Sequence, residues 1–212
     1  MNISRIILLR HGETVWNQES RIQGHLDSPL SVTGIAQAEA VAQRLAGENF
    51  AAIYSSDLGR AHETAERIAS VTSHRVILDS TLRERNLGVL QGLIRTEAKS
   101  LYPEIYTRYR TFDPDCVIPG GENAIHFITR VVATFTSIAS RFPGRSVVVV
   151  THGGTLDVMY RHASGLPLQG PRTASLPNAG FNCLILDEAG CWSPQLWGDV
   201  THLQKLLPSG SG

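Results

Sequence analysis

Two stretches of the chain, "IILLRHG" at residues 6–12 and "VVVVTHGG" at residues 147–154, share one pattern. Each is an aliphatic run that ends, after one polar residue, in histidine and glycine. An aliphatic run without polar alternation indicates a strand buried on both faces, as in parallel sheets. Ligands bind outside the carboxyl ends of such strands, which lie at one edge of the sheet. We therefore expect His11 and His152 to face each other at that edge.

Strands and helices are expected to alternate along most of the chain. Apolar residues at helical spacing predict helices over residues 33–46, 58–70, 124–142 and 155–163. Further strands are expected over 51–56 and 75–79 and in a closing hairpin whose turn lies near 188–190. This alternation predicts an α/β fold, a three-layer α/β/α sandwich with a central, mostly parallel sheet. We expect one domain over residues 1–207 and a flexible tail over 208–212.

Capping side chains are expected at three of the predicted helix starts. Thr33, Asp57 and Asn123 each stand where a helix begins, and their side-chain oxygens accept hydrogen bonds from free backbone N–H groups at that position. Between these elements, residues 92–119 are rich in Tyr, Arg and Pro. We expect this segment to form short helices over one end of the sheet.

The composition excludes several classes of protein. The 212 residues carry a formal net charge of zero at pH 7, so we expect neither a nucleic-acid nor a membrane partner. No apolar run approaches the roughly 20 residues that span a bilayer, and the N-terminus lacks the pattern of a signal peptide. The three cysteines show no paired spacing, which is typical of a reducing compartment. We expect a cytoplasmic protein.

Charged residues are expected to gather at the edge of the sheet that carries the two histidines. Arg10 precedes His11, Arg60 lies near the start of the helix after the second strand, and Glu84 soon follows the third strand. Guanidinium groups match phosphate oxygens and keep their charge. A neutral histidine can attack phosphorus, and a carboxylic acid can protonate the departing oxygen. These residues, with His152, predict a pocket for a transferable phosphoryl group.

The glycines after the two histidines extend this prediction. Gly12, Gly153 and Gly154 are expected to let backbone N–H groups approach an anion closely. The helix expected after Gly154 would also point its positive end at that anion. The other six histidines show no metal-binding spacing, so we expect no metal.

The motifs "LLRHGET", "SSDLGRAHETA", "LRERNLGVLQG" and "VVVTHGG", in this order, resemble the histidine phosphatase superfamily, the phosphoglycerate mutase-like proteins. The resemblance covers roughly residues 3–182. It implies that His11 is the phosphorylated nucleophile and that Glu84 is the general acid and base. It also implies phosphate binding by a further set of residues, namely Arg10, Arg60, His152, Asn17 and the Gly153 backbone. The family's usual "PGGES" is here "PGGEN", and Asn123 in place of Ser keeps a good helix cap.

The resemblance implies phosphoryl transfer, and two features of the sequence favour a phosphatase over a mutase. Mutases of the family carry a longer insertion between the Glu84 motif and the second histidine motif, and this chain has no such block. The segment "RIQGHLDSPLS" is closer to the family's phosphatases, and we place Gln23 and Gly24 among the substrate-binding residues. We therefore predict a metal-independent phosphomonoesterase of the histidine acid phosphatase type, without a cofactor, acting through a phosphohistidine.

Two alternatives stay open. One is a cofactor-dependent phosphoglycerate mutase, or a mutase side activity, and the other is a non-catalytic phosphate-binding protein. A protein that only binds phosphate needs arginine but not both a nucleophile and an acid. The presence of both His11 and Glu84 therefore weighs against the non-catalytic alternative. The oligomeric state, monomer or homodimer, is also open.

The predicted partner is a small-molecule phosphate ester. The predicted specificity wall comprises Gln23, His25, Leu26, Asn178, Phe181 and the Tyr-rich segment 102–110. This set holds aromatic and polar groups but no concentrated second cationic patch, which favours a small monophosphorylated metabolite over a bisphosphate. The Tyr-rich segment either forms a lid over the pocket or packs internally.

Overall fold

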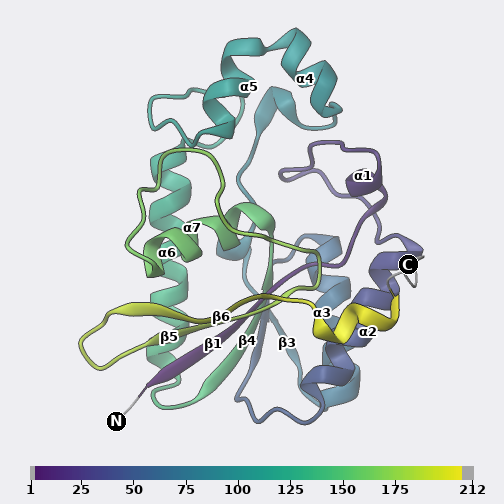
Figure 1. Ribbon diagram of the computed structural model, residues 1–212, viewed down its shortest axis with the longest axis vertical. Helices are drawn as coiled ribbons and strands as arrows, with labels where there is room; N and C mark the ends of the chain where they lie inside the picture. Colours follow the sequence, from purple (N-terminus) through teal and green to yellow (C-terminus); the bar gives the residue numbers. More distant parts are fainter. Residues whose placement is uncertain (1–2, 207–212) are drawn as a thin grey trace, which may run out of the picture.

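The chain folds around one mixed sheet (Figure 1). In the computed structural model, which describes residues 3–206, this sheet has six strands in the order β3-β2-β4-β1-β5-β6. The strands are β1 (Ser4–Arg10), β2 (Ile53–Ser55), β3 (Val76–Leu78), β4 (Ser146–Thr151), β5 (Phe181–Leu186) and β6 (Trp192–Asp199). Strands β1 to β4 run parallel, and β5 and β6 form an antiparallel edge. The predicted, mostly parallel sheet and the closing hairpin are confirmed.

Helices cover both faces of the sheet. The flanking helices are α2 (Val32–Leu45), α3 (Gly59–Thr72), α6 (Ala124–Arg141) and α7 (Gly153–Ala163). Ile7 and Leu9 of β1 pack with α2 and α3 in one core cluster, whereas Ile6 and Leu8 pack with α6 and α7 in another. Because each face of β1 is buried, the strand is aliphatic at successive positions rather than at every second one. The three-layer α/β/α sandwich is confirmed.

The register of the two central strands brings the two histidines together. Arg10 of β1 is paired with Thr151 of β4 in parallel register. The next residues, His11 and His152, therefore leave the sheet side by side at its carboxyl edge. Their ring centroids lie 5.3 Å apart.

Two short helices, α4 (Arg95–Leu101) and α5 (Pro103–Arg110), lie beyond the carboxyl ends of the strands, at the top of Figure 1. We call residues 95–110 the cap. It packs on its own small apolar cluster, which includes Ile22, Leu87, Leu90, Ala98, Cys116 and Ile118. The short helices expected over one end of the sheet are confirmed. Smaller elements are α1 (Val15–Gln18) and 3₁₀ turns at Ser80–Leu82, Gly88–Leu90 and Thr201–Leu206.

The helix caps agree only in part with the sequence prediction. Asn123 caps α6 as expected, with its Oδ1 accepting from the backbone N–H of Ile125 at 2.7 Å. Thr33 does not cap α2, because Ser31 takes that position and its Oγ accepts from the N–H of Gly34 at 3.0 Å. The sequence offers two hydroxyl residues there, and the earlier one begins the helix.

Asp57 also does not cap a helix. Leu58 occupies the N-cap position of α3 without a side-chain hydrogen bond. The Asp57 carboxylate instead accepts two hydrogen bonds from the guanidinium of Arg83, to Oδ1 from Nε at 2.6 Å and to Oδ2 from Nη2 at 2.5 Å. A bidentate ion pair outweighs a single cap bond. The predicted tail over 208–212 lies outside the described residues.

None of the helices within residues 3–206 has the combination of length and apolar composition needed to cross a bilayer.

Candidate active site

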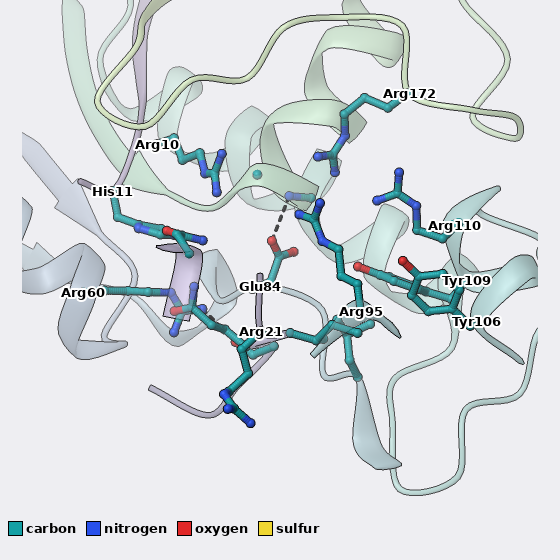
Figure 2. Close-up of a pocket in the computed structure, with 17 residues that line it drawn as sticks. Arg10, His11, Arg21, Arg60, Glu84, Arg95, Tyr106, Tyr109, Arg110 and Arg172 are labelled. Atoms are coloured by element: carbon teal, nitrogen blue, oxygen red, sulfur yellow. Dashed lines mark hydrogen bonds between the residues drawn. The ribbon is translucent and has the colours of Figure 1, made fainter. Parts of the chain in front are cut away.

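A cavity of about 110 Å³, open to solvent, lies between the carboxyl edge of the sheet and the cap. All but one of the residues predicted for the site line it: Arg10, His11, Asn17, Gln23, Gly24, Arg60, Glu84 and Gly153. The exception, His152, is fully buried behind the ring of His11. Figure 2 shows His11, Arg10 and Arg60 on one side of Glu84. Parallel strands and the helices that follow them thus bring separate motifs to one place.

His11 is held as a neutral imidazole with one fixed tautomer. Its Nδ1 lies 2.7 Å from the carbonyl oxygen of Gly12. Because a carbonyl only accepts, Nδ1 carries the proton and Nε2 keeps its lone pair. Burial, with the guanidinium groups of Arg60 and Arg10, lowers the pKa of His11 well below its usual value of 6.5. A buried, neutral imidazole with a free ring nitrogen is a competent nucleophile.

His152 lies next to the His11 ring and is hydrogen-bonded through one ring nitrogen. Its Nε2 lies 2.8 Å from Oγ of Ser56, and that hydroxyl accepts in turn from the N–H of Leu58. The Ser56 hydroxyl can donate to Nε2, and in that arrangement Nδ1 of His152 carries the proton. Nδ1 is buried without a partner in the described chain. Burial first, and then Arg60, lowers the pKa of His152 well below its usual value. The hydroxyl of Ser56 was not foreseen, because a serine after a short strand carries no distinctive spacing.

Arg10 and Arg60 are both held by backbone carbonyls. Arg10 donates from Nη1 to the carbonyl of Leu176 at 2.7 Å. Arg60 is 2% exposed and donates to the carbonyls of Leu26 and Gly24 at 3.0 and 2.8 Å. The Nε atoms of both arginines are buried without a partner among residues 3–206. Both guanidinium groups thus keep donors free for an anion in the cavity.

Asp27 makes an ion pair with Arg60, with Oδ1 accepting from Nη1 at 2.9 Å. Burial lowers the pKa of Arg60, and Asp27 opposes that shift. The role of Asp27 was missed, because the pairing joins segments far apart in the sequence and no spacing announces it.

The Glu84 carboxylate is oriented by two backbone N–H groups. Oε2 accepts from Gly154 at 2.8 Å, and Oε1 accepts from Arg85 at 2.9 Å. A Cβ on Gly154 would overlap Oε1 of Glu84, so only glycine allows this approach. Glu84 therefore stands at a fixed position across the cavity from His11, as Figure 2 shows.

The glycine prediction needs correction. The N–H of Gly12 donates to Oγ1 of Thr64 at 3.1 Å, and the N–H of Gly154 donates to Glu84. Neither is free to bind phosphate in this arrangement. Gly12 is required for a different reason, since a Cβ there would overlap the carbonyl of Gly34. Gly153, the first residue of α7, lines the cavity and points the start of that helix towards it.

Asn17, Gln23 and Gly24 shape one wall of the cavity. Asn17 Oδ1 accepts from the N–H of Thr14, and Gln23 Nε2 donates to the Thr14 hydroxyl at 2.9 Å. Gln23 Oε1 is buried without a partner in residues 3–206. Gly24 adopts φ +58°, which favours glycine, and directs its carbonyl to Arg60.

The predicted specificity wall is only partly correct. Gln23, Tyr106, Tyr109 and Arg110 line the cavity, whereas His25, Leu26, Asn178 and Phe181 are not among the described residues that line it. Asn178 instead donates to the carbonyl of His11 at 2.9 Å, and His25 bonds the carbonyl of Glu84. Asn178 and His25 thus contact the backbone of two residues that line the cavity, His11 and Glu84, but do not line it themselves. The Tyr-rich segment forms part of the cap, and its residues Tyr106, Tyr109 and Arg110 form part of the cavity wall.

The absence of a second cationic patch, expected from the sequence, is wrong. Arg95 and Arg110 of the cap and Arg172 of the loop after α7 line the same cavity, and Arg21 lines its rim. Figure 2 shows Arg95, Arg110 and Arg172 beyond Glu84 on the side away from His11 and Arg60. These arginines were missed because each stands in a different irregular or short helical segment. Only the tertiary fold brings them together.

No group of three or more His, Cys, Asp or Glu side chains placed to hold a metal ion occurs within the described part of the chain.

Comparison with known proteins agrees with the family resemblance of the sequence motifs. The family model described as "Histidine phosphatase superfamily (branch 1)" matches residues 6–200. The chain is 39% identical over 217 residues to phosphoglycerate mutase-like protein 4 of Arabidopsis thaliana, covering 100% of this chain and 93% of the relative. It is 39% identical over 207 residues to the metal-independent phosphoserine phosphatase of Arabidopsis thaliana, covering 96% and 85%. The solved structure of Bacillus stearothermophilus YhfR superposes with a TM-score of 0.87 at 30% identity, covering 95% of this chain and 100% of that one.

Proposed function

This chain belongs to the histidine phosphatase superfamily, and on that premise we propose that it is a metal-independent phosphomonoesterase acting through a phosphohistidine on His11. The observation that carries the proposal is the pair formed by His11 and Glu84 across one cavity. His11 is neutral with Nε2 free, and Glu84 is held opposite it by two backbone N–H groups. A nucleophile and an acid that line one cavity suit two-step ester hydrolysis.

In the first step, Nε2 of His11 attacks the phosphorus of the ester. The N–P bond forms as the bond from phosphorus to the leaving oxygen breaks. Protonated Glu84 gives its proton to that oxygen, so the alcohol leaves neutral. The low pKa of His11 keeps its lone pair available at neutral pH.

Positive charge around the phosphoryl group stabilises the transition state. Arg10 and Arg60 keep donors free at this end of the cavity, and His152 adds Nδ1–H. Phosphoryl transfer depends mostly on positioning and on neutralising the phosphoryl oxygens, which these groups supply. They are the phosphate-binding set of the proposal, together with Asn17 and the Gly153 backbone.

In the second step, water attacks the phosphohistidine. Glu84, now a carboxylate, takes a proton from that water as its oxygen bonds to phosphorus. The N–P bond breaks, phosphate departs, and His11 and Glu84 return to their starting protonation states. The open cavity admits water to the phosphohistidine, which favours hydrolysis over retention.

Phosphoglycerate mutase activity is a second candidate. It is favoured by the likeness to a phosphoglycerate mutase-like relative and by the arginines beyond Glu84. A mutase must keep its phosphoenzyme from water while the substrate reorients, and the solvent-open cavity is less suited to that. We also propose that the enzyme is of the histidine acid phosphatase type, with mutase activity at most a side activity.

Further parts of the proposal concern the molecule as a whole. We propose that residues 1–207 act as one catalytic domain on a small-molecule phosphate ester, as a monomer or homodimer. A cytoplasmic location is supported by Cys116, Cys183 and Cys191, which are all free thiols.

Phosphate release tests the proposed activity. We expect the purified chain to release phosphate from p-nitrophenyl phosphate at an unchanged rate in excess EDTA. His11→Ala should lose at least about a hundredfold in kcat, as expected for removal of a nucleophile. His62→Ala is the matched control, because that ring pairs with Glu66 on α3 away from the cavity. Loss of activity in EDTA, or an active His11→Ala enzyme, would contradict the proposal, and faster interconversion of phosphoglycerates than phosphate release would favour the mutase.

A further inference from the structure

We propose that Asn178 is a positioning residue of the active site, which holds the side-chain amide of Asn17 so that its Nδ2 faces the phosphoryl group as a hydrogen-bond donor. This inference rests on the proposed phosphomonoesterase function and adds a residue to its phosphate-binding end. Asn178 is not among the described residues that line the cavity, so it acts through Asn17, which does line it.

The amide of Asn178 has one orientation that its neighbours allow. Its Nδ2 lies 2.9 Å from the carbonyl oxygen of His11 and 3.3 Å from Oδ1 of Asn17. Because a carbonyl oxygen only accepts, the atom of Asn178 that contacts it must be the amino group, which donates. The two protons of that amino group serve the two acceptors. Asn178 therefore presents a donor to Asn17.

The orientation of Asn178 determines that of the Asn17 amide. The Asn17 atom that contacts Asn178 also receives the backbone N–H of Thr14, at 3.1 Å. Two donors can meet only at an oxygen, so Oδ1 of Asn17 points back into the protein. Nδ2 of Asn17 makes no hydrogen bond within residues 3–206, and it is the end of the amide left for a ligand in the cavity.

The two possible orientations of the Asn17 amide have opposite effects on a bound phosphate. Phosphate oxygens carry negative charge and accept hydrogen bonds, so an amino group in the cavity attracts them and a carbonyl oxygen repels them. A donor that is already aimed at the phosphate needs no reorientation when the ester binds or reacts. Asn178 thus contributes preorganisation, although it does not itself reach the phosphate.

The turn that carries Asn178 is fixed to the end of β1. Within residues 176–180, the carbonyl of Leu176 accepts from Nη1 of Arg10 at 2.7 Å, and the N–H of Ala179 donates to the Arg10 carbonyl at 3.0 Å. Ala179 is fully buried at φ +51°, a left-handed conformation that alanine rarely adopts. Such strain persists only where surrounding contacts impose it, and it is common at functional sites. The turn therefore places Asn178 at a defined position beside His11 and Asn17.

The bond to His11 alone does not account for Asn178. The carbonyl of His11 also accepts from the N–H of Ala179 at 3.3 Å, so it keeps a donor when the Asn178 amide is removed. Asn17 would instead lose one of the two donors that orient its Oδ1. The main consequence of removing the amide is therefore expected at Asn17.

A double-mutant cycle on phosphate binding tests this dependence. Calorimetry measures the Kd of inorganic phosphate for the unmodified chain, Asn178→Ala, Asn17→Ala and the double variant. We expect Asn17→Ala to raise Kd about tenfold, as for loss of a hydrogen bond to a charged group, and Asn178→Ala to raise it about fivefold. In the Asn17→Ala background, Asn178→Ala should change Kd by less than about twofold, because the amide that it orients is absent.

Asn123→Ala is the matched control. It also removes a side-chain amide and its hydrogen bonds, but at the start of α6 and outside the set of residues that line the cavity. We expect lower stability with an unchanged Kd. If Asn178→Ala does not fold, Asn178→Leu takes its place in the cycle, because leucine has the branching of asparagine without its amide groups.

Two results would overturn the inference: an unchanged Kd in the folded Asn178 variant, or an equal rise in Kd with and without Asn17. The second result would assign Asn178 a purely structural role. Failure of the proposed function has a different signature, namely no phosphate release from p-nitrophenyl phosphate by the unmodified chain. The binding cycle does not depend on turnover, so it decides the role of Asn178 in either case.

Discussion

The carboxylate of Glu84 accepts a hydrogen bond from the backbone N–H of Gly154 at 2.8 Å, and a Cβ on Gly154 would overlap its other oxygen. The α7 helix begins at Gly153, directly after His152. One helix start thus orients the proposed general acid, and the strand before it ends next to His152, a proposed phosphate-binding residue. The same short segment therefore positions both residues.

Gly154→Ala should therefore impair the acid step without unfolding the protein. Alanine suits a helix better than glycine, but its Cβ must displace the Glu84 carboxylate. We expect kcat/KM for an alkyl phosphate to fall at least about tenfold, since general acid catalysis contributes 10²–10⁴-fold. The value of kcat/KM for p-nitrophenyl phosphate should fall much less, because nitrophenolate leaves without a proton and because kcat/KM does not include the later hydrolysis of the phosphohistidine, in which Glu84 is the base.

Gly47→Ala is the matched control for that measurement. Gly47 follows α2, and a Cβ there would meet nothing within 4 Å. Steady-state kinetics of the two esters should be indistinguishable from those of the unmodified enzyme. Equal losses on both esters in Gly154→Ala would show that Glu84 does not act as the acid.

Ser56→Ala should weaken phosphate binding through His152. The Ser56 hydroxyl is 2.8 Å from Nε2 of His152 and sets which ring nitrogen carries the proton. Without it, one buried ring nitrogen has no partner and Nδ1–H is no longer favoured, at a cost of about 1–2 kcal/mol. We expect the inhibition constant of inorganic phosphate to rise about tenfold.

Ser140→Ala is a suitable control, because that exposed hydroxyl donates to the carbonyl of Ser137 within α6. An unchanged phosphate inhibition constant in Ser56→Ala would mean that His152 does not donate to phosphate.

Stability should decline in mild acid because two histidines are buried in the neutral form. The folded pKa values of His11 and His152 lie well below 6.5. Below about pH 6.5 the unfolded chain takes up protons that the folded chain does not. Their contribution to stability is complete above the unfolded pKa and is lost as the pH falls towards the folded pKa. The free energy of unfolding should drop by up to about 1.4 kcal/mol per pH unit for each histidine.

Urea unfolding between about pH 8 and about pH 5, without phosphate, measures this decline. His152→Asn should show a shallower slope, because asparagine takes up no proton. A slope that His152→Asn leaves unchanged would show that His152 is not buried neutral in solution.

The residues that sequence could predict lie where local pattern and a topological rule suffice. His11 and His152 each follow an aliphatic run, and parallel pairing brings the carboxyl ends of those runs to one edge. Arg60 and Glu84 follow the next two strands along the chain. Family resemblance then added roles that spacing alone does not give.

The residues that sequence could not predict depend on long-range packing. Arg95, Arg110 and Arg172 carry no shared motif, and their common position depends on how the cap and the loop after α7 fold over the cavity. Asp57 is a residue type that commonly caps helices, yet its carboxylate binds Arg83 instead of the start of α3. Competition between a local bond and a distant ion pair is not encoded in spacing.

The account's central claim is that Nε2 of His11 takes the phosphoryl group. Rapid mixing of the enzyme with a phosphate ester, quenched in alkali and analysed by peptide mass spectrometry, tests it most directly. We expect an acid-labile, alkali-stable phosphoryl group on the peptide that contains His11, and none in His11→Ala. A phosphoryl group on another residue, or phosphate release at full rate without any phosphoenzyme, would contradict the claim.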